Sequence, residues 1–126
     1  MVTHQSPKEY TWAVAFTLAQ DYGFTRVMSS YFFGDDTNTG PPHFDDEYYT
    51  TANVPINEDN SCGGGWVCEH RWNGIYKMAA FRTAVSGAPT AEFWSDGDAV
   101  GLARAGKGYF AMSKRSGFSK TVQTGK

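Results

Sequence analysis

The feature that most constrains this chain is a pair of cysteines, Cys62 and Cys68, separated by three glycines and two larger residues. They are the only cysteines among 126 residues. Because glycine allows sharp backbone turns at little steric cost, Cys62 can reach Cys68. In the chain-entropy model a bridge that closes so short a loop is worth about 2.4 kcal/mol. We favour a disulfide, with two unpaired structural thiols as the alternative. A zinc site would need four ligands at the usual short spacings, and the sequence offers none.

Two helices are predicted. Ser6-Pro7-Lys8-Glu9 has an N-cap serine, a proline at the first helical position and a glutamate that completes a capping box, so we expect a helix to about Gln20, followed by Gly23. Apolar residues at helical spacing predict a second helix from about Val67 to Ala84. Gly74 within it costs about 1 kcal/mol relative to alanine, so we expect close packing at that position.

Between the helices, the β-branched and aromatic stretch Thr25–Phe33 predicts a strand. A helix followed closely by an apolar strand is typical of the second half of a β-α-β unit, whose strands need a neighbour on each side. The residues before the first helix supply no such neighbour, so we expect that part of the fold lies outside this chain.

Residues 34–61 are predicted to form a long, turn-rich loop. The acidic residues within it resemble a calcium-binding loop only loosely. Counted from Asp36, the fifth position is Gly40, which has no side-chain oxygen, and the sixth is Pro41, where a glycine is required. We interpret the run as a solvated turn.

After Gly87 the sequence changes from helical spacing to short segments separated by turn residues. A turn at residues 105–108 separates Ala99–Arg104 from Tyr109–Ser113, which predicts an antiparallel hairpin, and we expect a further strand to start near Lys120. We therefore expect residues 1–86 to be α/β and residues 87–126 to begin an all-β unit.

Composition narrows the choice of partners. The chain has 11 Lys and Arg against 13 Asp and Glu, without a basic cluster, so nucleic acid and anionic membranes are poor partners. No apolar run approaches the roughly 18 residues of a membrane span. The first residues have no apolar core like that of a signal peptide, whereas a cysteine pair favours an oxidising compartment.

Several motifs together resemble the animal-type, chloride-dependent α-amylases. They run in order and with similar spacing: Ala13-Val14-Ala15-Phe16, Tyr22-Gly23-Phe24-Thr25-Arg26-Val27-Met28-Ser29-Ser30-Tyr31, Gly40-Pro41-Pro42, Gly65-Trp66-Val67-Cys68-Glu69-His70-Arg71-Trp72 and, more weakly, Phe93-Trp94 and Gly106-Lys107-Gly108-Tyr109. Cys62 and Cys68 match a disulfide of that family. His70 also matches a family position, and we expect it to be a hydrogen-bonded packing residue.

The resemblance implies a C-terminal fragment of a secreted, calcium-dependent glycoside hydrolase. That family cleaves internal α-1,4-glucosidic bonds of starch and glycogen with retention of configuration, and the complete enzyme is expected to be a monomer. Its (β/α)8 TIM barrel takes about 250 residues. Residues 1–86 would contribute the seventh helix, the eighth strand and the eighth helix. Residues 87–126 would begin the C-terminal Greek-key β-sandwich domain.

The family's catalytic aspartates and glutamate and its calcium ligands lie on earlier segments, so the resemblance implies no catalytic or metal-binding residue in this chain and no activity of the fragment alone. Arg26 matches the family's chloride-binding arginine. A salt bridge to a carboxylate from another strand is the alternative role for Arg26, because a buried cation needs an anion beside it.

Two departures from the family pattern are present. The loop after Tyr31 is shorter than in the vertebrate enzymes and lacks an Asp-Trp pair that lines their cleft, and the run from Trp94 to Asp98 also differs. A free-standing, non-catalytic carbohydrate-binding protein is the alternative function.

Overall fold

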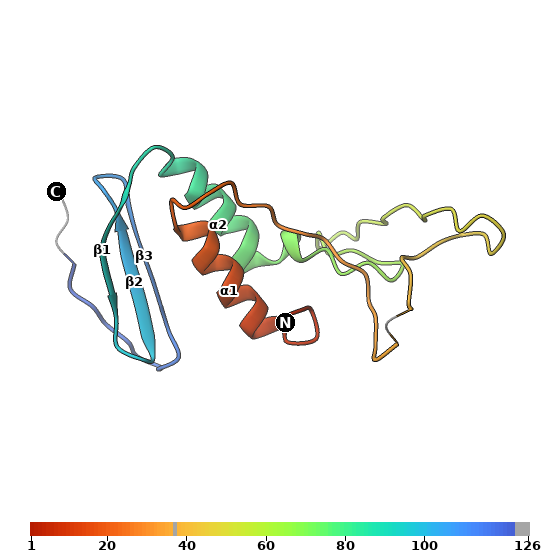
Figure 1. Cartoon of the computed structure of the whole chain (residues 1–126), viewed down its shortest axis with the longest axis horizontal. Helices are drawn as coiled ribbons and strands as arrows, with labels where there is room; N and C mark the ends of the chain where they lie inside the picture. Colours follow the sequence, from red (N-terminus) through yellow and green to blue (C-terminus); the bar gives the residue numbers. More distant parts are fainter. Residues whose placement is uncertain (37, 123–126) are drawn as a thin grey trace.

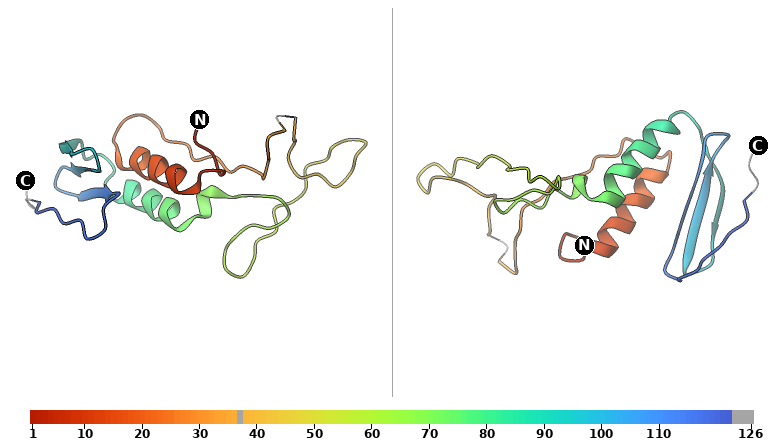
Figure 2. Two further views of the ribbon diagram at one scale, coloured as in Figure 1. Left: turned by 90° about the horizontal axis from the view of Figure 1, so that it is seen from below. Right: turned by 180° about the vertical axis from the view of Figure 1, so that it is seen from behind.

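The computed structural model describes residues 1–36 and 38–122. Two helices lie side by side, with a three-stranded sheet on one side of them and a long loop reaching away on the other (Figures 1 and 2). The elements are α1 (Pro7–Ala19), the 3-10 turn η1 (Glu69–Arg71), α2 (Asn73–Ala84), β1 (Thr90–Ser95), β2 (Ala99–Arg104) and β3 (Gly108–Ser113).

Helix α1 begins where the sequence predicts, but without the capping box. The Ser6 side chain makes no capping hydrogen bond. Instead the Ser6 N–H donates to the carbonyl of Thr3 at 3.0 Å, so a backbone turn precedes the helix. Pro7 occupies the first helical position, where a missing N–H costs nothing. The helix ends at Ala19, and Gly23 lies beyond its cap with a φ of +61°.

The second helix is shorter than predicted. Cys68 has a left-handed backbone with a φ of +55°, and Trp72 is extended with a ψ of 136°, so α2 begins only at Asn73. Both residues interrupt the helical dihedrals that the apolar spacing alone suggested. The prediction for Gly74 is confirmed, because a Cβ built there would lie 2.7 Å from Thr11 Cγ2 on α1.

The predicted hairpin is confirmed as β2 and β3, and β1 pairs with the other edge of β2, so the strand order is β1-β2-β3. In β1, two residues between Ala91 and Trp94 oppose one residue of β2. Glu92 in this bulge has a φ of +50°. Residues 114–122 form no strand. Only the first residues of the strand predicted to start near Lys120 fall in this range, and the rest of it lies outside the described residues.

The hydrophobic core joins the helices to the sheet. Ala15 and Ala19 of α1 pack with Leu102 of β2 and Phe110 of β3. A Cβ at Gly108 would lie 2.8 Å from Val85 Cγ1, so the sheet approaches the end of α2 closely. The core therefore spans both sides of Gly87, and the division into two domains there stays a prediction.

Two arginines that the sequence analysis did not single out hold the helix ends. Arg104 is 4% exposed and donates to the carbonyls of Ala88 (2.8 Å), Ala19 (3.0 Å) and Val85 (3.4 Å). Arg82 donates to carbonyls at the end of α1 and to that of Gly23. The last carbonyls of a helix have no partner within the helix, and a cation suits the negative end of its dipole.

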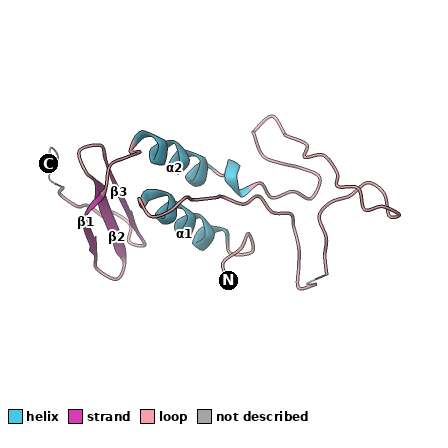
Figure 3. Cartoon of the chain, turned by 45° about the horizontal axis from the view of Figure 1, so that its top comes forward, coloured by secondary structure: helices cyan, strands magenta, loops and turns pink. Residues whose placement is uncertain are grey.

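The prediction of a strand over Thr25–Phe33 is wrong for this structure. The segment is extended, but its only ladder contact among the described residues is an isolated bridge between Tyr31 and Trp66. A strand requires continuous hydrogen bonding to a neighbour, and here only the end of the segment has one. The loop is confirmed over the described residues 34–36 and 38–61, which appear in pink in Figure 3. The TIM barrel and the Greek-key sandwich remain expectations for a larger structure.

Candidate functional site

The disulfide between Cys62 and Cys68 is present, with a Cα–Cα distance of 6.0 Å. The glycines make the turn between them possible. Gly64 and Gly65 have φ angles of +64° and +86°, and a Cβ on Gly65 would lie 3.0 Å from Pro42. The alternative of two unpaired thiols is therefore excluded in this structure.

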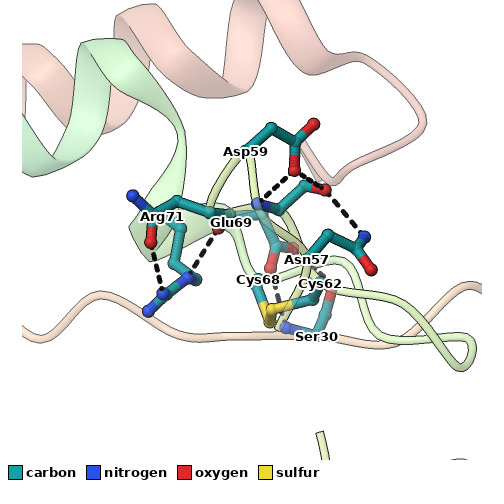
Figure 4. The surroundings of a disulfide bond; sticks show 9 residues. Ser30, Asn57, Asp59, Cys62, Cys68, Glu69 and Arg71 are labelled. Atoms are coloured by element: carbon teal, nitrogen blue, oxygen red, sulfur yellow. Dashed lines mark hydrogen bonds between the residues drawn. A yellow bond between two sulfur atoms is a disulfide. The ribbon is translucent and has the colours of Figure 1, made fainter. Parts of the chain in front are cut away.

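Beside the disulfide, Glu69 is 2% exposed and accepts hydrogen bonds from Ser30 (Figure 4). The Ser30 N–H donates to Glu69 Oε2 at 2.7 Å, and the Ser30 hydroxyl donates to Oε1. The Val67 N–H returns a bond to the Ser30 carbonyl at 2.9 Å. A buried carboxylate is costly unless it is hydrogen-bonded, so this pairing fixes the extended segment against the disulfide turn. Burial, and to a smaller extent the negative charge of Glu69, raises the pKa of Tyr10.

Arg71 holds the end of the long loop on the same turn. Its Nε donates to the Asn60 carbonyl at 2.8 Å, and its Nη2 donates to Asn60 Oδ1 at 3.1 Å (Figure 4). Asp59 accepts hydrogen bonds from the N–H and hydroxyl of Ser61, which lower its pKa. The loop thus returns to the disulfide through defined polar contacts. His70 is predicted to be a hydrogen-bonded packing residue. It is exposed and has no hydrogen bond among the described residues, so this expectation is wrong for the structure.

Arg26, the predicted chloride-binding residue, lies on the extended segment that the disulfide turn holds. It is exposed, and its guanidinium lies 5.9 Å from the centre of the Phe24 ring. Within residues 1–36 and 38–122 it forms no ion pair. The anion role of Arg26 stays a prediction.

The side chains around Arg26 divide into two faces, as expected for extended backbone. On one face Tyr31 contacts Trp66, and Phe33 contacts His4, with ring centres 6.4 and 4.5 Å apart. On the other face, which includes Arg26, Phe24 is 88% exposed and Met28 71%. The same face continues to Ser30, which bonds to Glu69, and to Phe32, whose ring centre lies 5.5 Å from that of His4, so the face of Arg26 is bare only from Phe24 to Met28.

No group of three or more His, Cys, Asp or Glu residues that could hold a metal ion occurs in the part of the chain that the structure describes. Near the tip of the loop, Asp45 instead accepts the N–H groups of Tyr48 at 2.6 Å and Thr50 at 3.2 Å. It therefore closes a turn, in agreement with the interpretation of this acidic run.

Known proteins match this chain over nearly its whole length. It is 45% identical to an α-amylase of Pecten maximus over 127 residues, which cover 98% of this chain and 24% of that protein. It is 41% identical to an α-amylase of Tribolium castaneum over 126 residues, covering 99% of the chain and 25% of the relative. The chain belongs to the animal α-amylase family.

The fold agrees with that assignment. The crystal structure of α-amylase I from Eisenia fetida matches 91% of this chain with a TM-score of 0.74 and 32% sequence identity. A mutant of that enzyme, solved as a complex with maltohexaose, matches with a TM-score of 0.75. Each match covers 24% of the larger chain, so this chain spans about a quarter of its α-amylase relatives. No family model matches the sequence.

Proposed function

We propose that this chain is a C-terminal part of an α-amylase that hydrolyses internal α-1,4-glucosidic bonds of starch and glycogen with retention of configuration. The observation that carries the proposal is the 45% identity to an α-amylase across 98% of the chain. The relative in complex with maltohexaose supports α-glucans as the partners of the complete enzyme.

Retaining hydrolysis needs two carboxyl groups about 5–5.5 Å apart, one as nucleophile and one as acid/base. We propose that both belong to segments outside this chain, as do the ligands of the calcium ion expected in the complete enzyme. The 126-residue chain is then inactive alone. A chain that hydrolysed starch by itself would overturn this part of the proposal.

The part we assign to this chain is anion binding by Arg26. If the bare face around Arg26 is covered in the complete enzyme, its guanidinium becomes buried and needs an anion, because an unpaired buried cation costs several kcal/mol. Chloride would meet that need. A negative charge near the acid/base glutamate raises the pKa of that residue, which keeps it protonated for its first step.

The test is the substitution Arg26→Gln in the complete enzyme, with Arg115→Gln as the control. Arg115 is also exposed, but it pairs with Asp96 at 2.5 Å beside the C-terminal sheet. We expect Arg26→Gln to abolish chloride activation and Arg115→Gln to keep it. In the wild type, removing chloride should lower the pKa of the acid and move the alkaline limb of the kcat profile to lower pH. An unchanged chloride response and pH profile in Arg26→Gln would refute the anion role.

A non-catalytic carbohydrate-binding function is the second candidate. It is favoured by the exposed aromatic side chains of Phe44, Tyr48 and Tyr49 near the loop tip, since aromatic rings can stack on sugars. Affinity electrophoresis of the 126-residue chain in gels containing starch separates the two candidates. Saturable retardation would support this second function, and unchanged mobility would support the first.

We also propose that the complete enzyme is secreted and monomeric. The Cys62–Cys68 disulfide supports an oxidising compartment. No helix in the described part of the chain is long and apolar enough to cross a membrane. The genomic sequence upstream tests the larger proposal: it should encode the remaining barrel strands and their carboxylates, and the absence of such a reading frame would contradict it.

A further inference from the structure

The tip of the long loop, residues 41–52, is held together around one imidazole. Backbone bonds join its two sides: the Ala52 N–H donates to the Pro42 carbonyl at 2.8 Å, and the Phe44 N–H donates to the Thr50 carbonyl at 3.1 Å. His43 and Thr51 form an isolated bridge between them. The tip is thus an ordered, narrow hairpin without a regular strand.

The His43 ring has an acceptor at each nitrogen. Its Nδ1 lies 3.2 Å from the Pro41 carbonyl oxygen, and its Nε2 lies 3.1 Å from Asp46 Oδ1. A neutral imidazole carries one N–H and can satisfy only one of these oxygens, whereas the imidazolium donates to both. The arrangement therefore suits the protonated ring.

We propose that the loop tip is a pH-responsive element in which protonated His43 links Pro41 to Asp46 and holds the ring of Tyr49 in place. The His43 and Tyr49 rings have centres 5.0 Å apart, so a change at the imidazole reaches that tyrosine directly. Tyr49 has a left-handed backbone with a φ of +50°, a conformation that persists in a residue other than glycine only where surrounding contacts hold it.

The charged groups around the imidazole all favour its protonation. Asp46 faces Nε2, and Asp45 lies close enough to act through its charge. The hydrogen bond to the Pro41 carbonyl and then the one to Asp46 raise the pKa of His43. Because the folded-state pKa lies above that of the unfolded chain, the stabilisation is complete below the unfolded value and is lost as the pH rises through the folded one. Deprotonation leaves one of the two oxygens without a donor and loosens the tip.

The test is an NMR titration of the 126-residue chain between pH 5 and 9. It follows the His43 ring, the Tyr49 ring and the amides of Thr51 and Ala52. We expect the Tyr49 and amide signals to move with the same midpoint as the His43 ring, and that shared transition to vanish in His43→Gln. Tyr49 signals that did not respond across the His43 midpoint would overturn the proposal.

Two charge substitutions test the link to Asp46. Asp46→Asn should lower the midpoint of His43, because it removes the carboxylate that faces Nε2. Glu47→Gln is the matched control, since it removes one negative charge from the adjacent position, and it should leave the midpoint nearly unchanged. Equal shifts in the two variants would indicate a general charge effect of the acidic tip and would contradict a specific cross-link.

Discussion

Replacing Arg104 with methionine should lower the free energy of unfolding, because Arg104 links the sheet to the ends of the two helices. Arg104→Met keeps much of the side-chain volume but removes every donor to the carbonyls of Ala88, Ala19 and Val85. Hydrogen bonds from a charged donor contribute about 1.5–3 kcal/mol each, and two of the three have good geometry. Methionine also relieves the cost of burying a cation, so we expect a net loss of about 2–4 kcal/mol.

The assay is urea unfolding of the 126-residue chain, followed by tryptophan fluorescence and circular dichroism. With a slope of about 2 kcal/mol per molar urea, in the middle of the usual range, the midpoint should fall by about 1–2 M. Lys107→Met is the control, because Lys107 donates to the carbonyl of Ser86 at 2.7 Å from an exposed position. That change should cost less than about 0.5 kcal/mol.

Arg104→Lys serves if the methionine variant does not fold. It keeps the charge but replaces the fork of donors by one ammonium group, so its midpoint should lie between those of Arg104→Met and the wild type. Equal midpoints for wild type and Arg104→Met, or equal shifts for Arg104→Met and Lys107→Met, would refute the reasoning that these carbonyls depend on Arg104.

Two further changes test the packing and charge of the same unit. Gly74→Ala should destabilise the chain although alanine favours helix by about 1 kcal/mol, because its Cβ would lie 2.7 Å from Thr11 Cγ2. Adding Thr11→Ser removes that methyl group and should recover stability in the same urea assay. A Gly74→Ala variant more stable than the wild type would contradict the contact. Hydrogen bonds from the Thr90 backbone and then its side chain lower the pKa of Asp21 below 3.8, so this contact stabilises the fold above that pH and is lost as the pH falls through the lower folded-state value. Unfolding midpoints of wild type and Asp21→Asn should therefore converge in acid, and a difference that did not change with pH would count against it.

The elements that the sequence predicted well are those set by local chemistry. Pro7 marks the start of α1, and the glycine-rich turn brings Cys62 to Cys68. The hairpin of β2 and β3 follows from the turn residues between two short segments. In each case the residues that decide the structure are close neighbours in the sequence.

The features that the sequence did not predict depend on distant partners. Arg104 is the last residue of the otherwise apolar strand β2, and nothing in its local pattern indicates that it meets the end of α1, 85 positions away. Ser30 and Glu69 likewise pair across 39 positions. At Ser6 the capping box did not form: the Ser6 N–H, which the Glu9 side chain would have accepted, donates to the Thr3 carbonyl instead.

For the candidate site, sequence reasoning located Arg26, but only the structure shows what surrounds it. Period-two alternation gives a segment two faces and does not say which of them is covered. Here Tyr31 and Phe33 meet Trp66 and His4, whereas Arg26 lies on the open face.

The uneven contacts of the extended segment also predict where it tolerates mutation. In the isolated chain, polar replacements at Met28 should cost little because its side chain is 71% exposed, and those at Phe24 remove only a contact with the exposed Arg26. Replacements at Tyr31 and Phe33 instead break ring contacts with Trp66 and His4. Tolerance to substitution should therefore be high around Arg26 and low near Tyr31. In a larger assembly that covers the open part this difference should disappear, so a mutational scan of the segment would report whether anything lies against it.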